Sequence, residues 1–140
     1  MEADPEKSRR QKKIEELILT KERVDLWYKL RDDDISVVAG ALARSTTLTV
    51  LNLGGHGYRI GDAEVKLIAD ALRSNTSCKL RELNLNMNSI GPNGTKFLAE
   101  ALRHSNCKLQ KLCLGNNHIG HRGARYLAMA LCCAIPTASC

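Results

Sequence analysis

Apolar residues recur along this chain in blocks that follow one another at nearly constant spacing. The segments that begin at Leu80 and Leu109 both read L-x-x-L-x-L-x-x-N-x-I-G and lie 29 residues apart. A third copy begins at Leu48, 32 residues before Leu80, and is longer in the loop over 54–59. The alternating leucines within each block predict a short strand with one buried face.

The second half of each block carries a different pattern. An A-x-A-L sequence closes it four times, ending at residues 42, 72, 102 and 131. Apolar residues at offsets of three and four, such as Leu98, Ala101 and Leu102, predict an amphipathic helix. Units of this kind cannot bury their apolar face alone, so they stack. We therefore expect an α/β fold: a right-handed leucine-rich solenoid with parallel strands on the concave face and helices on the convex face.

Two asparagines occupy the same place in successive units, where the chain leaves the strand. Asn88 and Asn117 can each bond the polar backbone groups of the following loop, which predicts a ladder of side-chain amides between neighbouring units. His56 stands at this place in the first unit, and we expect the ladder to be broken there.

This repeat resembles the leucine-rich repeats of the ribonuclease-inhibitor-like subtype, which also occur in nucleotide-binding immune receptors, tropomodulin and Ran GTPase-activating protein. The resemblance covers residues 34–131 and implies the fold described above. It does not imply one activity, because members of this family share a scaffold and vary its surface.

The pattern divides the chain into three parts. Residues 1–33 are predicted to form a basic helix, from about Glu6 to Thr20, and a degenerate cap with a strand-like alternation from Val24 to Leu30. Residues 34–131 hold one helical half-repeat and three full repeats. Residues 132–140 form a short tail without a polar helix to cover the last unit. A longer array, a partner or self-association would each cover that end.

Composition and charge narrow the function classes. The net charge is +6, and residues 1–13 hold five basic against three acidic groups. We interpret this run as a solvated helix face, not as a nuclear signal or a nucleic-acid patch, and expect no nucleic-acid partner.

The apolar stretch 128–135 is too short to span a membrane. The acidic start is no secretory signal, so we expect a cytoplasmic or nuclear protein with reduced thiols. Cys78 and Cys107 occupy equivalent positions and should be neighbours, with an oxidation-sensitive pair as the alternative.

The sequence contains only weak motifs for nucleotide binding, metal binding or catalysis. The glycine-rich segment 55–61 lacks the third glycine of a dinucleotide fingerprint and a following Lys-Ser/Thr pair, so we interpret it as a surface loop. His118 and His121, and likewise His104 and Cys107, have metal-ligand spacing, but no fourth ligand is implied. No Ser/His/Asp arrangement emerges. We therefore expect no cofactor, no metal and no enzyme activity.

A binding surface is better defined. Residues between the buried leucines of a strand point to the opposite face, and curved repeat surfaces commonly bind partners. We predict a protein–protein interaction module of scaffold or receptor type, with Arg81 and Lys111 facing an acidic partner. A regulator of a small GTPase, by the resemblance, and a structural component that self-associates through its uncapped C-terminal end are the alternatives. The predicted partner-binding residues are Trp27, Asn52, Tyr58, Arg59, Arg81, Glu82, Asn84, Asn86, Met87, Gln110, Lys111, Cys113 and Asn116.

Overall fold

Helices and strands alternate along the whole described chain. The computed structural model describes residues 4–26, 29–31, 33–55 and 58–134. The order of elements is α1 (Pro5–Thr20), β1 (Arg23–Asp25), α2 (Asp34–Leu42), β2 (Val50–Asn52), α3 (Asp62–Ser74), β3 (Glu82–Asn84), α4 (Pro92–Leu102), β4 (Lys111–Cys113) and α5 (Gly120–Ala134).

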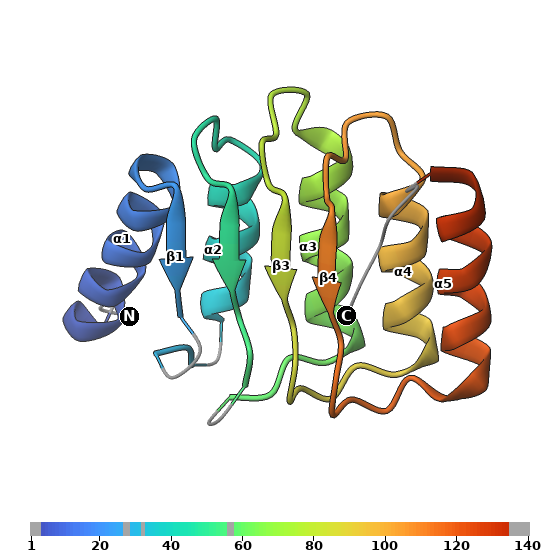
Figure 1. The fold of residues 1–140 in the computed structure, drawn as a ribbon. Coiled ribbons are helices and arrows are strands. Elements are labelled where there is room, and N and C mark those ends of the chain that lie inside the picture. The colour runs from blue at the N-terminus through green and yellow to red at the C-terminus, as the bar shows by residue number, and fades with distance from the viewer. Residues whose placement is uncertain (1–3, 27–28, 32, 56–57, 135–140) are drawn as a thin grey trace.

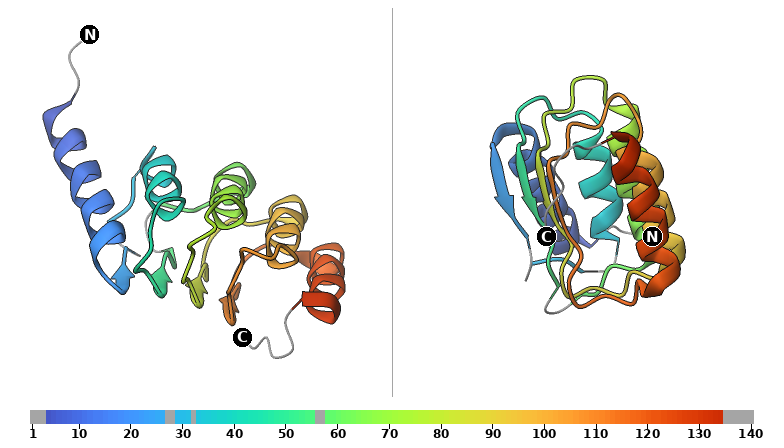
Figure 2. Two further views of the ribbon diagram at one scale, coloured as in Figure 1. Left: turned by 90° about the horizontal axis from the view of Figure 1, so that it is seen from above. Right: turned by 45° about the vertical axis from the view of Figure 1, so that its right-hand side comes forward.

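The four strands form one parallel sheet in sequence order, β1-β2-β3-β4. Each strand is followed by a helix that returns the chain over the same side of the sheet, in right-handed crossovers (Figure 1). Seen from above, the strands follow the inner side of a curve and the helices its outer side (Figure 2). The predicted α/β solenoid, with strands on the concave face and helices on the convex face, is confirmed.

The repeated leucines build the core between the two layers. Leu51 and Leu83 stand opposite each other in the sheet register, and both are buried. On the helical side, the small side chains of Ala41, Ala71 and Ala101 are also buried, which allows each helix to approach the sheet closely. The leucines and alanines that define the sequence repeat are thus the two halves of one core.

The predicted asparagine ladder is present. Asn88 is fully buried; its Nδ2 donates to the carbonyl oxygens of Leu53 and Leu85, and its Oδ1 accepts from the N–H of Ile60 at 2.8 Å. Asn117 repeats this arrangement one unit later, with its Oδ1 accepting from Ile90. Each amide therefore joins two consecutive units. His56 lies outside the described residues.

The first strand is shorter than its apolar alternation predicts. The N–H of Leu26 still donates to the carbonyl of Asn52, but Lys29 then donates to the carbonyl of Leu26 and closes a turn. Leu30 is buried beyond that turn, so its alternation with Leu26 reflects a shared core position and not a continuing strand. The strand prediction through Leu30 is wrong; Tyr28 lies outside the described residues.

Helix α1 matches the predicted basic helix and covers the first unit. Ile14 and Ile18 are buried in the common core. Asp34, fully buried at the start of α2, accepts two hydrogen bonds from the Arg10 guanidinium, at 3.0 and 3.2 Å, and one from Gln11 at 3.2 Å. Lys7 pairs with Asp33 at 2.7 Å. Part of the basic run thus docks this helix onto the repeats.

Candidate functional site

The open face of the sheet carries a shallow hollow of about 210 Å³. The register places residues 50, 82 and 111 in one row across β2, β3 and β4, and residues 52, 84 and 113 in the next. Because side chains alternate across a strand, these two rows face away from the helices. The side chains beside this hollow are Arg23, Val50, Asn52, Glu82, Asn84, Lys111 and Cys113. Most predicted partner-binding residues of the strands thus come together here.

Two asparagine side chains in the hollow present hydrogen-bond donors. The Oδ1 of Asn52 accepts from the N–H of Gly54 at 3.0 Å, and the Oδ1 of Asn84 accepts from the N–H of Asn86 at 2.9 Å. Each oxygen is thus held by the backbone two residues on, which leaves each Nδ2 group to donate elsewhere. Neither Nδ2 bonds to another described residue, so both can donate to a bound molecule.

Charged side chains of both signs flank these amides. Glu82 and Lys111 stand opposite each other in the register of β3 and β4, yet they form no ion pair with each other or with another described residue. Arg81 and Gln110 are exposed beside them, and Arg23 pairs with Asp25 at 3.3 Å. Charges that remain separate within the module can be paired by a partner.

Met87 lies in the loop that follows β3, in a backbone conformation that its side chain disfavours. Its φ is 59°, in the left-handed region, and Asn116 has the same conformation at the same place one unit later, with φ 56°. Asparagine tolerates this region, whereas a left-handed methionine costs about 1 kcal/mol. Met87 is nevertheless 37% exposed. The loop therefore carries an exposed apolar side chain that folding alone does not require.

Other predicted residues lie away from the hollow. Tyr58 is half-buried in the loop before α3, next to the start of α2, and its hydroxyl donates to Glu64 at 2.8 Å. Burial opposes ionisation of Glu64, but hydrogen bonds from Tyr58 and from backbone N–H groups lower its pKa below the ordinary value. Arg59 is exposed on the same loop. Trp27 lies outside the described residues.

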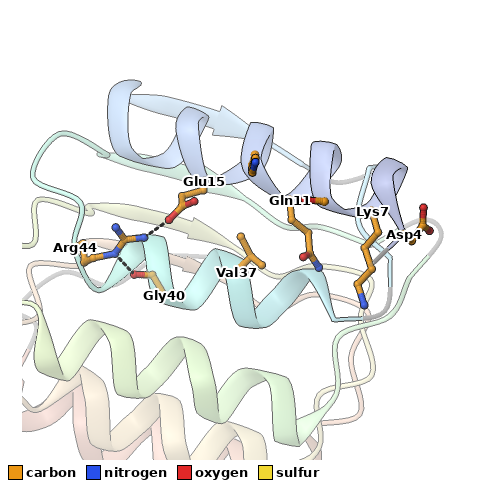
Figure 3. Close-up of a pocket in the computed structure, with 9 residues that line it drawn as sticks. Asp4, Lys7, Gln11, Glu15, Val37, Gly40 and Arg44 are labelled. Atoms are coloured by element: carbon orange, nitrogen blue, oxygen red, sulfur yellow. Dashed lines mark hydrogen bonds and ion pairs between the residues drawn. The ribbon is translucent and has the colours of Figure 1, made fainter. Parts of the chain in front are cut away.

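A second concavity, which the sequence did not lead us to predict, lies between α1 and α2 (Figure 3). It has a volume of about 540 Å³. We call it the helix groove; its lining residues are Asp4, Lys7, Ser8, Gln11, Lys12, Glu15, Val37, Gly40 and Arg44. It is on the side of the helices, away from the open face of the sheet.

Gly40 is the sequence signal that could have revealed this groove. It is the variable residue of the A-x-A-L sequence, and Asp70, Glu100 and Met129 fill the same place in later units. A Cβ atom added at Gly40 would meet no neighbouring atom within 4 Å. Glycine inside a helix costs about 1 kcal/mol relative to alanine, and no close approach in the structure requires it here.

The cysteines and histidines form no metal site in the described part of the chain. There, no group of three or more His, Cys, Asp and Glu side chains is placed to hold a metal ion. Burial raises the pKa of the Cys107 thiol, and the neighbouring Cys78 raises it further, which agrees with the predicted proximity of the two. Among the described helices, none has the length and apolar character needed to cross a membrane.

Fold and concave face together define a repeat protein that presents a curved surface. Residues 76–99 and 105–128 match the family model described as Leucine Rich repeat. These two stretches are thus similar to leucine-rich repeats, and the repeat and the fold resemble those of the ribonuclease-inhibitor-like type. A search of curated protein sequences returns no significant match.

Two solved structures show the same architecture. The actin-binding site 2 of leiomodin-1 superposes with a TM-score of 0.74 and 16% identity, over 99% of this chain and 82% of that one. The tropomodulin C-terminal domain of Caenorhabditis elegans gives 0.69 and 15% identity, over 86% and 75% of the respective chains. At such low identity the likeness concerns the fold.

Proposed function

We propose that this chain is a protein-binding module, not an enzyme, whose concave face docks on a protein partner. One observation carries the proposal: the hollow on the sheet gathers two amide donors and two opposite charges that have no partners of their own within the described chain. Polar groups arranged in this way orient and select a partner.

Each group of side chains on this surface has its own role in the proposed docking. The Nδ2 groups of Asn52 and Asn84 would donate to carbonyl or carboxylate oxygens of the partner. Arg81 and Lys111, both exposed, would face acidic groups. Met87 would supply the apolar contact, since exposed methionines are enriched at interfaces. Its left-handed conformation, held against its preference, agrees with such a role.

The test is a comparison of two matched charge reversals in affinity capture from cells, read by mass spectrometry. Arg81→Glu/Lys111→Glu alters the residue before β3 and the first residue of β4, beside the hollow of the concave face. Lys66→Glu/Lys96→Glu alters the convex face on two neighbouring helices by the same total charge. We expect the concave variant alone to lose its specific partners by tenfold or more. Equal retention of every partner by both variants would overturn the proposal.

Actin is a candidate partner, because the chain superposes on an actin-binding site of leiomodin-1 over nearly its whole length. Fluorescence anisotropy with labelled monomeric actin, and co-sedimentation with filaments, would test both forms of actin. Binding that the concave reversal weakens and the convex reversal leaves intact would support it. Absence of binding in both assays would remove actin and leave the concave face to be tested with captured partners.

The two alternative functions make separate predictions. Regulation of a small GTPase would appear as faster GTP hydrolysis on addition of the protein. Assembly through the C-terminal end would appear as a mass that rises with concentration in light scattering. We also propose a cytoplasmic or nuclear location, which the free thiols of Cys78 and Cys107 support.

A further inference from the structure

We propose that the helix groove between α1 and α2 is a second docking site, which binds an acidic peptide segment of a partner protein through a bulky apolar side chain. This site is separate from the concave face and does not depend on the function proposed for that face.

The groove is formed in advance because α1 is fixed at both of its ends. Near the start of α1, Lys7 pairs with Asp33. Near its end, Glu15 pairs with Arg44, whose Nε also donates to the carbonyl oxygen of Gly40 at 3.3 Å (Figure 3). These contacts hold the two helices without filling the space between them. A rigid groove binds at lower entropic cost than one that must form on binding.

On the α2 side, the middle of the groove is apolar and open. Val37 projects from α2 toward α1 (Figure 3), and Gly40 lies one turn further along α2. The position of Gly40 is filled by a longer side chain in every later helix, and here nothing occupies the space. A leucine or phenylalanine of a bound peptide would fill it and bury the exposed part of Val37.

The charges at the rim favour an acidic peptide. Lys12 is exposed and forms no ion pair with any described residue. The charged residues that line the groove are basic at Lys7, Lys12 and Arg44 and acidic at Asp4 and Glu15. Because Lys7 and Arg44 are each paired with a carboxylate, Lys12 carries the excess positive charge. An acidic residue that flanks the apolar side chain would therefore gain charge complementarity with Lys12.

The experiment uses the full chain on an array of 15-residue synthetic peptides. The peptides are acidic, neutral or basic, each with and without one central phenylalanine. We expect the wild type to bind the acidic peptides that contain phenylalanine. Gly40→Leu should weaken this binding by tenfold or more. Asp70→Leu introduces the same side chain at the equivalent position one unit later, and it should leave peptide binding unchanged. Arg81→Glu/Lys111→Glu should also leave it unchanged, which separates this site from the concave face.

Two further variants guard against loss of folding. Lys12→Glu changes an exposed residue that forms no ion pair with a described residue. It should weaken the binding of acidic peptides by about threefold or more, and the binding of basic peptides should not become more sensitive to salt. Gly40→Ala should raise the urea midpoint of unfolding. Binding that survives both Gly40→Leu and Lys12→Glu, or equal binding of basic and acidic peptides, or no binding of any peptide, would overturn the proposal.

Discussion

Equivalent leucines at the two ends of the sheet differ in how far they are buried. Leu26 in the first unit and Leu114 in the last occupy equivalent positions. Leu26 is fully buried, beneath the layer that includes α1. Leu114, beyond which no described strand or helix packs, is only half-buried. Equivalent positions in the repeat thus differ in burial because, in the described part of the chain, a neighbour covers one and not the other.

This difference shows where the stability of a solenoid resides. A leucine in one unit is buried by the next unit, so the stabilising contribution belongs to the interface between units. At the N-terminal end, α1 provides that interface with the apolar side chains Ile14 and Ile18 and with ion pairs to α2. The C-terminal end has the leucines of the repeat but, among the described residues, not their covering layer. We therefore expect equivalent substitutions to have unequal effects.

The largest effect is expected for truncation of the buried leucine at the covered end. Leu26→Ala should lower the free energy of unfolding by about 3 to 4 kcal/mol, through lost burial and a residual cavity. Leu114→Ala should cost about 1 to 2 kcal/mol, because the leucine is already partly solvated. Urea denaturation followed by circular dichroism would measure both. Equal losses would contradict the account of the two ends.

The next effect concerns the ionic attachment of α1. Asp34→Ala would leave the Arg10 guanidinium without its buried partner and should cost about 3 kcal/mol. The amides of α1 should then exchange with deuterium faster than those of α4. Asp70→Ala, on the exposed face of α3, serves as the control and should change stability little. Unchanged exchange in α1 would show that its apolar contacts alone hold it.

The asparagine ladder permits the same comparison for a polar residue. Asn88→Ala removes a fully buried amide and leaves the Ile60 N–H without an acceptor, at a cost of about 2 to 3 kcal/mol. Asn117→Ala should cost about 1 kcal/mol, since water reaches this half-buried site. Amide exchange at Ile60 and Ile90 reports the two losses separately. A larger loss from Asn117→Ala would contradict the expected order.

The smallest effect is a pH dependence at the covered end. The hydrogen bond from Lys7, and then its charge, lower the pKa of Asp33. A lowered pKa means that the ion pair stabilises the fold above the ordinary pKa of an aspartate and is lost as the pH falls through the lowered value. Asp33→Asn should therefore lower the urea midpoint slightly at pH 7 and leave it unchanged at pH 2. An equal shift at both pH values would assign the effect to something other than charge.

The fold was predictable because its signals repeat. Leucines, alanines and asparagines at constant spacing predicted the parallel register and the amide ladder, since each position must meet its equivalent in the next unit. The end of β1 could not be predicted, because Leu30 belongs to the core through a turn. The apolar alternation there does not distinguish a strand from a turn that returns to the same core.

The candidate sites were predictable only in part. Alternation along β2, β3 and β4 identified the open face, and the structure brings those residues together. The positive φ of Met87 depends on the loop geometry of the unit. In the sequence, only the asparagine at the equivalent position, Asn116, hinted at a left-handed conformation there. The helix groove depends on how far α1 stands from α2, a tertiary distance that no pattern within one helix records. Gly40 is the one sequence feature that could have indicated the groove.

The central claim, that the concave face docks the partner, is tested most directly by hydroxyl-radical footprinting of the complex with the captured protein. Met87 and Met129 are both exposed and both oxidise readily, but Met87 lies at the rim of the concave face and Met129 on α5. We predict that complex formation lowers the oxidation of Met87 by several-fold and leaves Met129 unchanged. Protection of Met129 with Met87 still fully reactive would contradict the claim.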